Sequence, residues 1–286
     1  MLIRPLGSRI WILHNLIIFF RPYYNQKYII KRAKIISTDC DNPNRGCQLK
    51  SAVILAAGIG SRLSPITNNI PKCCIRVKNK PIIVRITDQL LSCDGKMNIN
   101  IVVGHLSDKV RDEMANYPDN VKIVENLEYQ NTNNMESCRI GLAENDVMSG
   151  DLLIINGDCV YSDQIVTLMH GLKSSAIGID TSRFSEENMK ILTQSGRAVA
   201  ISKGILKSQG GLTSIDLYNF TNKDVIDLYS IMEGYFQNQD RNKWTEVAIN
   251  DLLKKTESNV GIVDISGERW MEIDNHDDLE AAQNLW

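Results

Sequence analysis

The chain has 286 residues, of which 43% are apolar and 23% are charged, as in ordinary globular proteins and unlike fibrous or disordered ones. Its 32 basic and 34 acidic residues leave a formal net charge of −2, so we expect no nucleic-acid partner and no general attraction to anionic membranes. Any anion-binding site must therefore be local. The seven cysteines are scattered and lack zinc-ligand spacing, which indicates reduced thiols and a cytoplasmic location.

The first fifty residues differ in composition from the rest. An apolar run over 10–20, bounded by Arg9 and Arg21, has about half the length that a membrane-spanning helix requires, and no small-residue cleavage site follows it. An interfacial helix, a partner-docking segment and a start codon assigned too early are the alternatives. We favour an appendage outside the catalytic core and disfavour membrane contact. The predicted division is an apolar and basic extension with a linker, 1–50, followed by one domain, 51–286.

From residue 51 onward, apolar strands alternate with helices. We predict strands at 52–56, 99–103, 121–124, 152–155 and 175–179, with helices at 82–92, 107–116, 135–144 and 163–172. A more β-like part covers 197–205 and 211–220, followed by helices at 222–239 and 245–255, strands at 260–265 and 269–274, and a helix at 276–286. The first strands are continuous Val, Ile and Leu runs, which are typical of a sheet covered on both faces. The pattern predicts an α/β fold with a doubly wound, mostly parallel, Rossmann-like sheet and helices on both faces.

The stretch SAVILAAGIGSR joins an apolar strand to a glycine loop. Gly58 and Gly60 permit positive φ and close approach of the backbone to an anion, so we expect the loop to bind phosphate. A plain turn is the alternative interpretation of two glycines. The Walker pattern is absent, and Leu63 stands where G-x-G-x-x-G has its third glycine. Arg62 and Lys72, which singly are typical surface residues, are expected to meet the phosphate charge.

Two aspartates stand at predicted strand ends. Asp158 follows LLIING and Asp274 follows RWMEI. Open α/β sheets bind ligands at the carboxyl ends of their strands, and nucleotidyl transfer needs divalent cations beside the phosphates. We therefore expect the two carboxylates to converge beside the glycine loop, with a helix cap or a turn as the alternative for Asp158. Asp277 and Asp278 are expected to stabilise the amino end of the last helix.

Several of these residues form a known signature. The pattern G-x-G-[ST]-R-x-x-P-x-T, followed by P-K, stands here as Gly58, Gly60, Ser61, Arg62, Pro65, Thr67, Pro71 and Lys72. The chain therefore resembles the sugar-nucleotidyltransferase superfamily over roughly 51–286. A second pattern, N-x-x-Y-x-x-T-N-N-x-x-S, resembles the cytidylyltransferase branch that activates phosphocholine and aminoethylphosphonate. It consists of Asn126, Tyr129, Thr132, Asn133, Asn134 and Ser137, although capping is the alternative for the two adjacent asparagines. The late stretch W-x-E-I-D-x-x-x-D-L, which contains Trp270, Glu272 and Asp274, is also typical of that branch.

The resemblance implies a nucleotidyltransferase fold, Mg²⁺ as cofactor, and Asp158 and Asp274 as its ligands. It further implies that Lys72 lies by the α-phosphate or the acceptor phosphate and Arg62 by the β- and γ-phosphates, so that these four residues form the catalytic set. The implied nucleotide-binding residues are Leu55, Ala56, Ala57, Gly58, Gly60, Ser61, Arg62, Lys72, Asn134, Ser137 and Gly157.

The implied reaction joins CTP to a small phosphorylated or phosphonylated acceptor and releases pyrophosphate and a CDP- or CMP-linked product. A sugar-1-phosphate nucleotidyltransferase using UTP, dTTP or GTP is one alternative, and a non-catalytic regulatory or scaffold protein on the same fold is another. The acceptor stays open. A choline-like acceptor needs an aromatic or acidic cage, for which the candidates are Tyr161, Tyr218, Trp244, Glu246 and Trp270, each with a core role as the alternative. Sugar phosphates would instead use polar residues such as Asn219 and Asn250.

Overall fold

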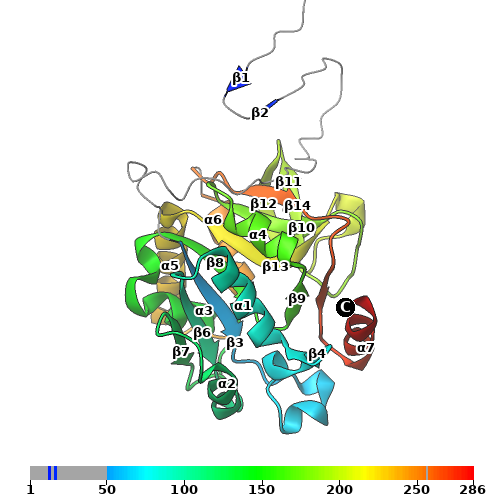
Figure 1. The fold of residues 1–286 in the computed structure, drawn as a ribbon. Helices are drawn as coiled ribbons and strands as arrows, with labels where there is room; N and C mark the ends of the chain where they lie inside the picture. Colours follow the sequence, from blue (N-terminus) through cyan, green and yellow to red (C-terminus); the bar gives the residue numbers. More distant parts are fainter. Residues whose placement is uncertain (1–11, 14–15, 18–49, 256) are drawn as a thin grey trace, which may run out of the picture.

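The structure is a computed structural model that describes residues 12–13, 16–17, 50–255 and 257–286 (Figure 1). Strand β1 (Ile12–Leu13) pairs antiparallel with β2 (Leu16–Ile17). Of the rest of the predicted extension, Lys50 begins β3 (Lys50–Ala56) and so belongs to the domain, whereas the other residues, and with them the alternatives for the role of the extension, lie outside the described residues.

A nine-stranded mixed sheet forms the centre of the fold. Its first half is parallel, in the order β8 (Asp151–Asn156), β3 (Lys50–Ala56), β6 (Asn98–Val103) and β7 (Val121–Glu125). These are the continuous apolar runs of the sequence, and every residue of β3 is buried. The prediction of a Rossmann-like α/β arrangement is confirmed for this half.

The second half of the sheet is mainly antiparallel and begins where β13 (Leu212–Phe220) pairs with β8. Its other strands are β10 (Ala176–Asp180), β11 (Lys190–Gln194), β12 (Arg197–Ser202) and β14 (Gly261–Asp264). Because β10 also pairs with β13, the pairings of these five strands close on themselves. The prediction of a mostly parallel sheet is wrong here. The residues between β11 and β12, Ser195 and Gly196, have φ values of 52° and 78°, and such a two-residue turn joins only antiparallel strands.

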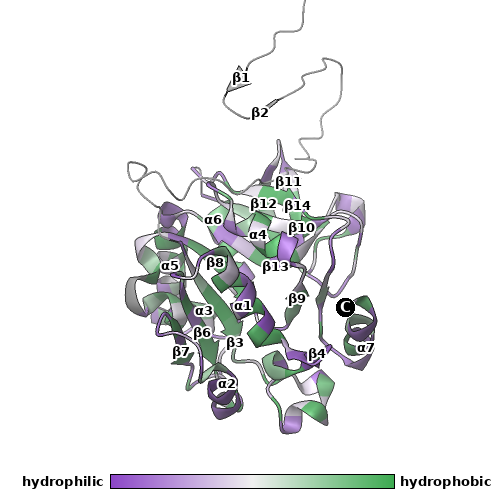
Figure 2. Ribbon diagram, viewed as in Figure 1, coloured by the Kyte–Doolittle hydropathy of each residue, from purple (hydrophilic) through white to green (hydrophobic). Residues whose placement is uncertain are grey.

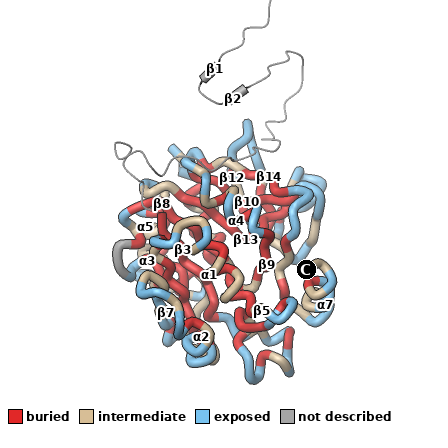
Figure 3. The backbone as a smooth tube through the Cα atoms, in the orientation of Figure 1, coloured by how far each residue is buried: buried red, intermediate tan, exposed pale blue. Residues whose placement is uncertain are grey.

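Helices cover both faces of the sheet, as predicted (Figure 1). One face packs against α1 (Ile82–Cys93), α2 (Ser107–Met114) and α4 (Asp163–His170), and α7 (His276–Leu285) lies to the side, beside β15 (Trp270–Glu272). The other packs against α3 (Asn134–Ala143), α5 (Asn222–Gln237) and α6 (Thr245–Leu253). Along β3, Ala52 and Ile54 belong to the first core, whereas Val53 and Leu55 belong to the second. Figure 2 shows the apolar residues concentrated on the sheet, and Figure 3 shows the same strands buried.

No helix among the described residues has both the length and the apolar character needed to cross a membrane. The described cysteines are free thiols, as expected: Cys73, Cys74, Cys93, Cys138 and Cys159.

A buried lysine ties the start of β3 to the second half of the sheet. Lys50 Nζ donates to the carbonyls of His170 (2.8 Å) and Leu172 (3.0 Å) and to Asn219 Oδ1 (2.7 Å). Burial lowers the pKa of Lys50 to about 8. The Asn219 amide in turn donates to the carbonyl of Ser174 at 2.8 Å. Asn219, a candidate acceptor contact from the sequence, therefore belongs to the core.

We expect Lys50→Met to lower the free energy of unfolding by about 2 kcal/mol or more, because three acceptors would lose their donor. Urea denaturation followed by circular dichroism measures this. Lys122, exposed on β7, supplies the control, and Lys122→Met should change stability by less than about 0.5 kcal/mol. Equal stability of the two variants would contradict a structural role for Lys50.

Candidate active site

The glycine loop follows β3 at the carboxyl edge of the sheet. Gly60 adopts the left-handed conformation with φ 68° and ψ 38°, and its carbonyl accepts a hydrogen bond from Thr67 Oγ1 at 2.9 Å. A Cβ atom on Gly60 would lie 3.0 Å from Cβ of Lys72. Glycine is therefore required here both for its conformation and for the close passage of Lys72.

An antiparallel ribbon brings distant parts of the chain beside this loop. Strand β9 (Cys159–Tyr161) pairs with β15 (Trp270–Glu272), with Glu272 opposite Cys159. Just beyond the ribbon, the Ile273 N–H donates to the Asp158 carbonyl at 3.0 Å. Consequently one carboxylate oxygen from each of Asp158, Glu272 and Asp274 lies within 4.8 Å of the other two. Clustered carboxylate oxygens are the ligands that Mg²⁺ prefers, so these three residues fit such an ion.

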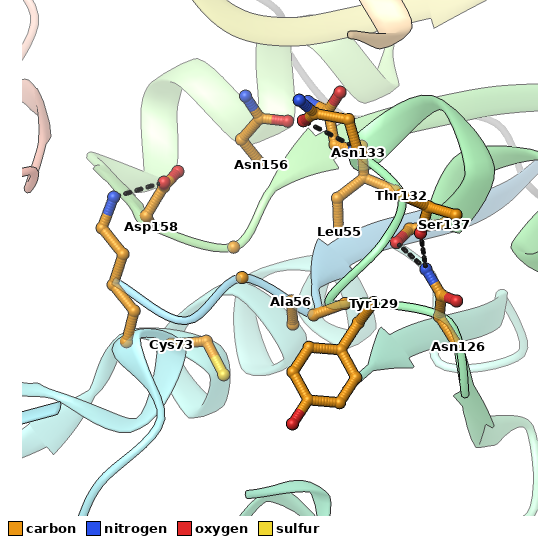
Figure 4. A pocket seen from close by; sticks show the side chains of 15 residues that line it. Leu55, Ala56, Cys73, Asn126, Tyr129, Thr132, Asn133, Ser137, Asn156 and Asp158 are labelled. Atoms are coloured by element: carbon orange, nitrogen blue, oxygen red, sulfur yellow. Dashed lines mark hydrogen bonds and ion pairs between the residues drawn. The ribbon is translucent and has the colours of Figure 1, made fainter. Parts of the chain in front are cut away.

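The four residues of the predicted catalytic set meet at this cluster. Lys72 Nζ lies 2.6 Å from Asp158 Oδ2 and 2.7 Å from Asp274 Oδ1. Arg62 Nη2 lies 2.8 Å from Asp274 Oδ2, and its Nη1 lies 3.9 Å from Glu187 Oε2. The ion pair of Lys72 with Asp158 is visible in Figure 4. The cations expected to bind phosphate thus lie against the carboxylates expected to bind metal.

The charges of this network reinforce one another. Burial alone would lower the pKa of Lys72, but Asp158 and Asp274 outweigh it and raise that pKa above its ordinary value. Burial opposes ionisation of Asp274 as well, yet Lys72 and then Arg62 hold the pKa of Asp274 below its usual range. The lysine is therefore charged at neutral pH, as a phosphate ligand must be.

The pKa of Glu272 is shifted in the opposite direction from that of Asp274. Burial, and then the nearby carboxylates of Asp216, Asp158 and Asp274, raise the pKa of Glu272 to about 10. Asn188 Nδ2 donates to Glu272 Oε2 at 2.6 Å. Glu272 therefore keeps its proton at neutral pH, and a cation bound beside it would favour its ionised form.

A cavity of about 160 Å³ extends from this charged cluster along the edge of the sheet (Figure 4). Of the residues predicted to bind nucleotide, it is lined by Leu55, Ala56, Ala57, Gly58, Lys72, Asn134, Ser137 and Gly157. Gly60, Ser61 and Arg62 stand outside this lining, where Arg62 instead pairs with Asp274. The remaining lining residues are Cys73, Asn126, Tyr129, Thr132, Asn133, Asn156 and Asp158.

Hydrogen bonds order the polar wall of the cavity. Asn126 Nδ2 donates to Thr132 Oγ1 at 3.2 Å and to Ser137 Oγ at 3.1 Å (Figure 4). Asn133 Oδ1 accepts from the Asn134 N–H at 2.9 Å, so Asn133 caps α3. The capping alternative therefore holds for Asn133, which also lines the cavity.

Among the residues at the site that were not predicted as ligands are Glu272 and Asn156. Asn156 lines the cavity, and its buried Oδ1 has no hydrogen-bond partner among the described residues. Each stands two positions before a predicted aspartate, Asp274 or Asp158. Because side chains two apart on a strand share a face, this spacing was the signal that could have found both.

Most residues considered for an acceptor cage lie in the core instead. The Tyr161 hydroxyl donates to the Ile215 carbonyl at 2.7 Å, and Trp270 Nε1 donates to Asp180 Oδ2 at 2.8 Å. The Tyr218 hydroxyl donates to Asp216 and Glu246 carboxylate oxygens at 3.0 Å each, and Asn250 Oδ1 accepts from the Ile201 N–H at 3.1 Å. Of this group, Trp244 is exposed.

At the last helix, Asp278 Oδ2 accepts from the N–H of Asp274 and Asn275, which confirms the capping role expected of Asp278.

We expect Lys72→Met to strengthen Mg²⁺ binding in the absence of nucleotide, because the acidic cluster loses a competing cation. Thermal unfolding with and without MgCl₂ measures this, and the metal should raise the midpoint by at least about 2 °C more in the variant than in the wild type. Lys109→Met, at an exposed position on α2, should respond like the wild type. Equal shifts in all three proteins would show that Lys72 does not compete for the metal site.

The chain is similar in sequence and fold to known nucleotidyl- and cytidylyltransferases. A protein-family model described as nucleotidyl transferase matches residues 51–189. The 2-aminoethylphosphonate cytidylyltransferase of Lancefieldella rimae is 28% identical over 233 residues, which cover 81% of this chain and 91% of that protein. The CTP:phosphoglutamine cytidylyltransferase of Campylobacter jejuni is 28% identical over 255 residues, covering 81% and 98%. Among solved structures, the CTP:phosphocholine cytidylyltransferase of Streptococcus pneumoniae superposes with a TM-score of 0.67 at 20% identity, covering 83% of this chain and 99% of that one.

Proposed function

We propose that this chain, an enzyme with a nucleotidyl transferase domain, transfers a cytidylyl group from CTP to a small phosphorylated or phosphonylated acceptor. The products would be pyrophosphate and a CDP- or CMP-linked compound. We assign the activity to the unit 51–286. The two relatives named above act on CTP or transfer a cytidylyl group, and both match over nearly their whole length, which supports this substrate class.

One observation carries the proposal. Two cations and three carboxyl groups from segments far apart in the sequence meet at one end of a cavity at the carboxyl edge of the sheet. This edge is where open α/β sheets bind their ligands. A triphosphate would bring the negative charge that Lys72 and Arg62 need, and a metal ion would bring the positive charge that the acidic cluster needs. The two ligands therefore complement the site together.

In the proposed reaction, residues of this chain would hold the phosphates and stabilise the charge on them. An oxygen of the acceptor's phosphate or phosphonate attacks the α-phosphorus of CTP, the new P–O bond forms, and the bond to the bridging oxygen of pyrophosphate breaks. No general base is needed, because the attacking oxygen is already anionic. Lys72, which is charged, would lie near the α-phosphate and stabilise the negative charge that spreads over the phosphoryl oxygens. Arg62 would hold the β- and γ-phosphates that leave.

Asp158, Glu272 and Asp274 would hold Mg²⁺. The bound ion would neutralise phosphate charge and orient the triphosphate. Lys72 and Arg62 pair with the same carboxylates, so in the complex these two cations would exchange those partners for phosphate oxygens.

We expect CTP to be the best nucleotide in an assay of pyrophosphate release with Mg²⁺. CTP, UTP, dTTP and GTP are each combined with 2-aminoethylphosphonate, phosphocholine, phosphoglutamine and several sugar 1-phosphates. Turnover with CTP and a non-sugar acceptor would support the proposal. If UTP, dTTP or GTP with a sugar 1-phosphate were preferred, the alternative sugar-nucleotidyltransferase activity would replace it. No turnover with any pair would favour a non-catalytic protein.

Lys72→Ala and Asp158→Ala should each lower kcat/KM by at least about a hundredfold, the scale expected when a group that stabilises transition-state charge is removed. Steady-state kinetics with the best substrate pair measures the loss. Lys109→Ala should retain the wild-type rate, because this exposed lysine on α2 is not part of the cavity lining. Near-normal activity of either active-site variant would refute its assigned role.

A further inference from the structure

We propose that the segment 240–244, which we call the strap, positions the nucleoside end of the cavity, and that Phe236 fixes the strap through a stack with Arg139 and Arg241. The inference rests on the proposed function in one respect, namely that the cavity binds a nucleotide. Phe236 does not line the cavity, so it would act as a positioning residue and not as a contact.

The strap pairs with the cavity wall through its backbone. The N–H of Asn133 donates to the Arg241 carbonyl at 3.3 Å, and the N–H of Met135 donates to the Lys243 carbonyl at 3.2 Å. Both donors lie at the start of α3, where the first N–H groups of a helix have no acceptor within the helix. The strap carbonyls therefore complete the amino end of α3. Asn133 also reaches the strap through its side chain, whose Nδ2 donates to Asn242 Oδ1 at 3.3 Å.

The capping is reciprocal. Thr245 is the first residue of α6, and its N–H donates to Asn134 Oδ1 at 2.8 Å. The cavity residue Asn134 thus caps the helix that follows the strap, while the strap caps the helix that begins at Asn134. A shift of the strap must therefore move Asn133 and Asn134, both of which line the cavity.

A cation–π stack holds the strap against the body of the protein. The guanidinium carbon of Arg139 lies 4.0 Å from the centroid of the Phe236 ring, and that of Arg241 lies 3.9 Å from it. At these distances two planar guanidinium groups fit only on opposite faces of the ring. Phe236, near the end of α5, is therefore sandwiched between a residue of α3 and a residue of the strap.

The inner arginine of the stack is rigidly held. Arg139 donates to both carboxylate oxygens of Glu136, at 2.9 and 3.0 Å, and to Glu233 Oε1 at 2.6 Å. The outer arginine is different, because the neighbouring carboxylate of Asp240 pairs with Lys243 at 3.2 Å. The guanidinium of Arg241 lies on the ring instead. The aromatic face is thus the feature that transmits the fixed position of Arg139 to the strap.

The critical variant is Phe236→Leu, which keeps an apolar side chain and removes the aromatic face. The dissociation constant of CTP, measured by isothermal titration calorimetry with Mg²⁺, should rise about fivefold to tenfold, as expected for the loss of a partly desolvated cation–π contact. The rate at saturating CTP should stay within about twofold. Phe236→Tyr keeps the ring and should bind CTP like the wild type.

Tyr235→Phe is the matched control on the same helix end. It removes the hydrogen bond from the Tyr235 hydroxyl to Asp251 Oδ2 (2.7 Å) but leaves the stack intact. Its affinity for CTP should equal that of the wild type even if its stability falls. If Phe236→Leu does not fold, Arg241→Gln removes the outer guanidinium alone and should weaken CTP binding in the same way.

Hydrogen–deuterium exchange tests the strap without any nucleotide. In Phe236→Leu or Arg241→Gln the amides of peptides covering 131–137 should exchange faster, since two of them donate to the strap, and Tyr235→Phe should leave them unchanged. The inference would be overturned if these variants showed unchanged exchange in this region. It would also be overturned if the wild type bound CTP and the variants bound it with the same affinity. If the wild type binds no nucleotide, the proposed function fails, and the exchange result alone decides the role of the strap.

Discussion

The site depends on one ammonium group shared by two carboxylates. Lys72 bridges Asp158 and Asp274 across a gap that separates the loop after β8 from the loop after β15. Removing such charges from water is costly, and a partly buried ion pair seldom contributes much to stability on balance. The pair instead fixes geometry, because it keeps the Lys72 ammonium and the carboxylate oxygens of Asp158 and Asp274 within one hydrogen bond of each other.

The two halves of the sheet contribute different parts of this arrangement. The parallel half presents the glycine loop after β3 and Asp158 after β8 at the same edge, as parallel strands always do. The antiparallel ribbon of β9 and β15 then returns the end of the chain to that edge, and its register sets Glu272 opposite Cys159. A shift of one residue in this register would turn Glu272 to the other face of the ribbon, so that its carboxyl group would no longer lie beside those of Asp158 and Asp274.

Helix capping positions the polar wall of the cavity. The strap carbonyls accept from N–H groups at the start of α3, and Asn134 of α3 accepts from the first N–H of α6. Asn133 and Asn134 therefore cap helices and line the cavity at once. This explains why the sequence is compatible both with helix caps and with ligand contacts at these two positions.

The sequence alone determined the helices, the strands of the parallel half, the glycine loop and the four charged residues, because apolar periodicity, glycine placement and a spaced signature are local properties of the chain. It did not predict β9, β11 or the antiparallel pairing of the second half, because the order of these strands depends on pairings between segments far apart in sequence. It also did not find Asn156 or Glu272 as site residues, or the stack on Phe236. Those features arise only when distant segments pack together, since the register of a strand pair, the burial of a carboxyl group and the contact of a ring with two arginines are properties of the tertiary structure.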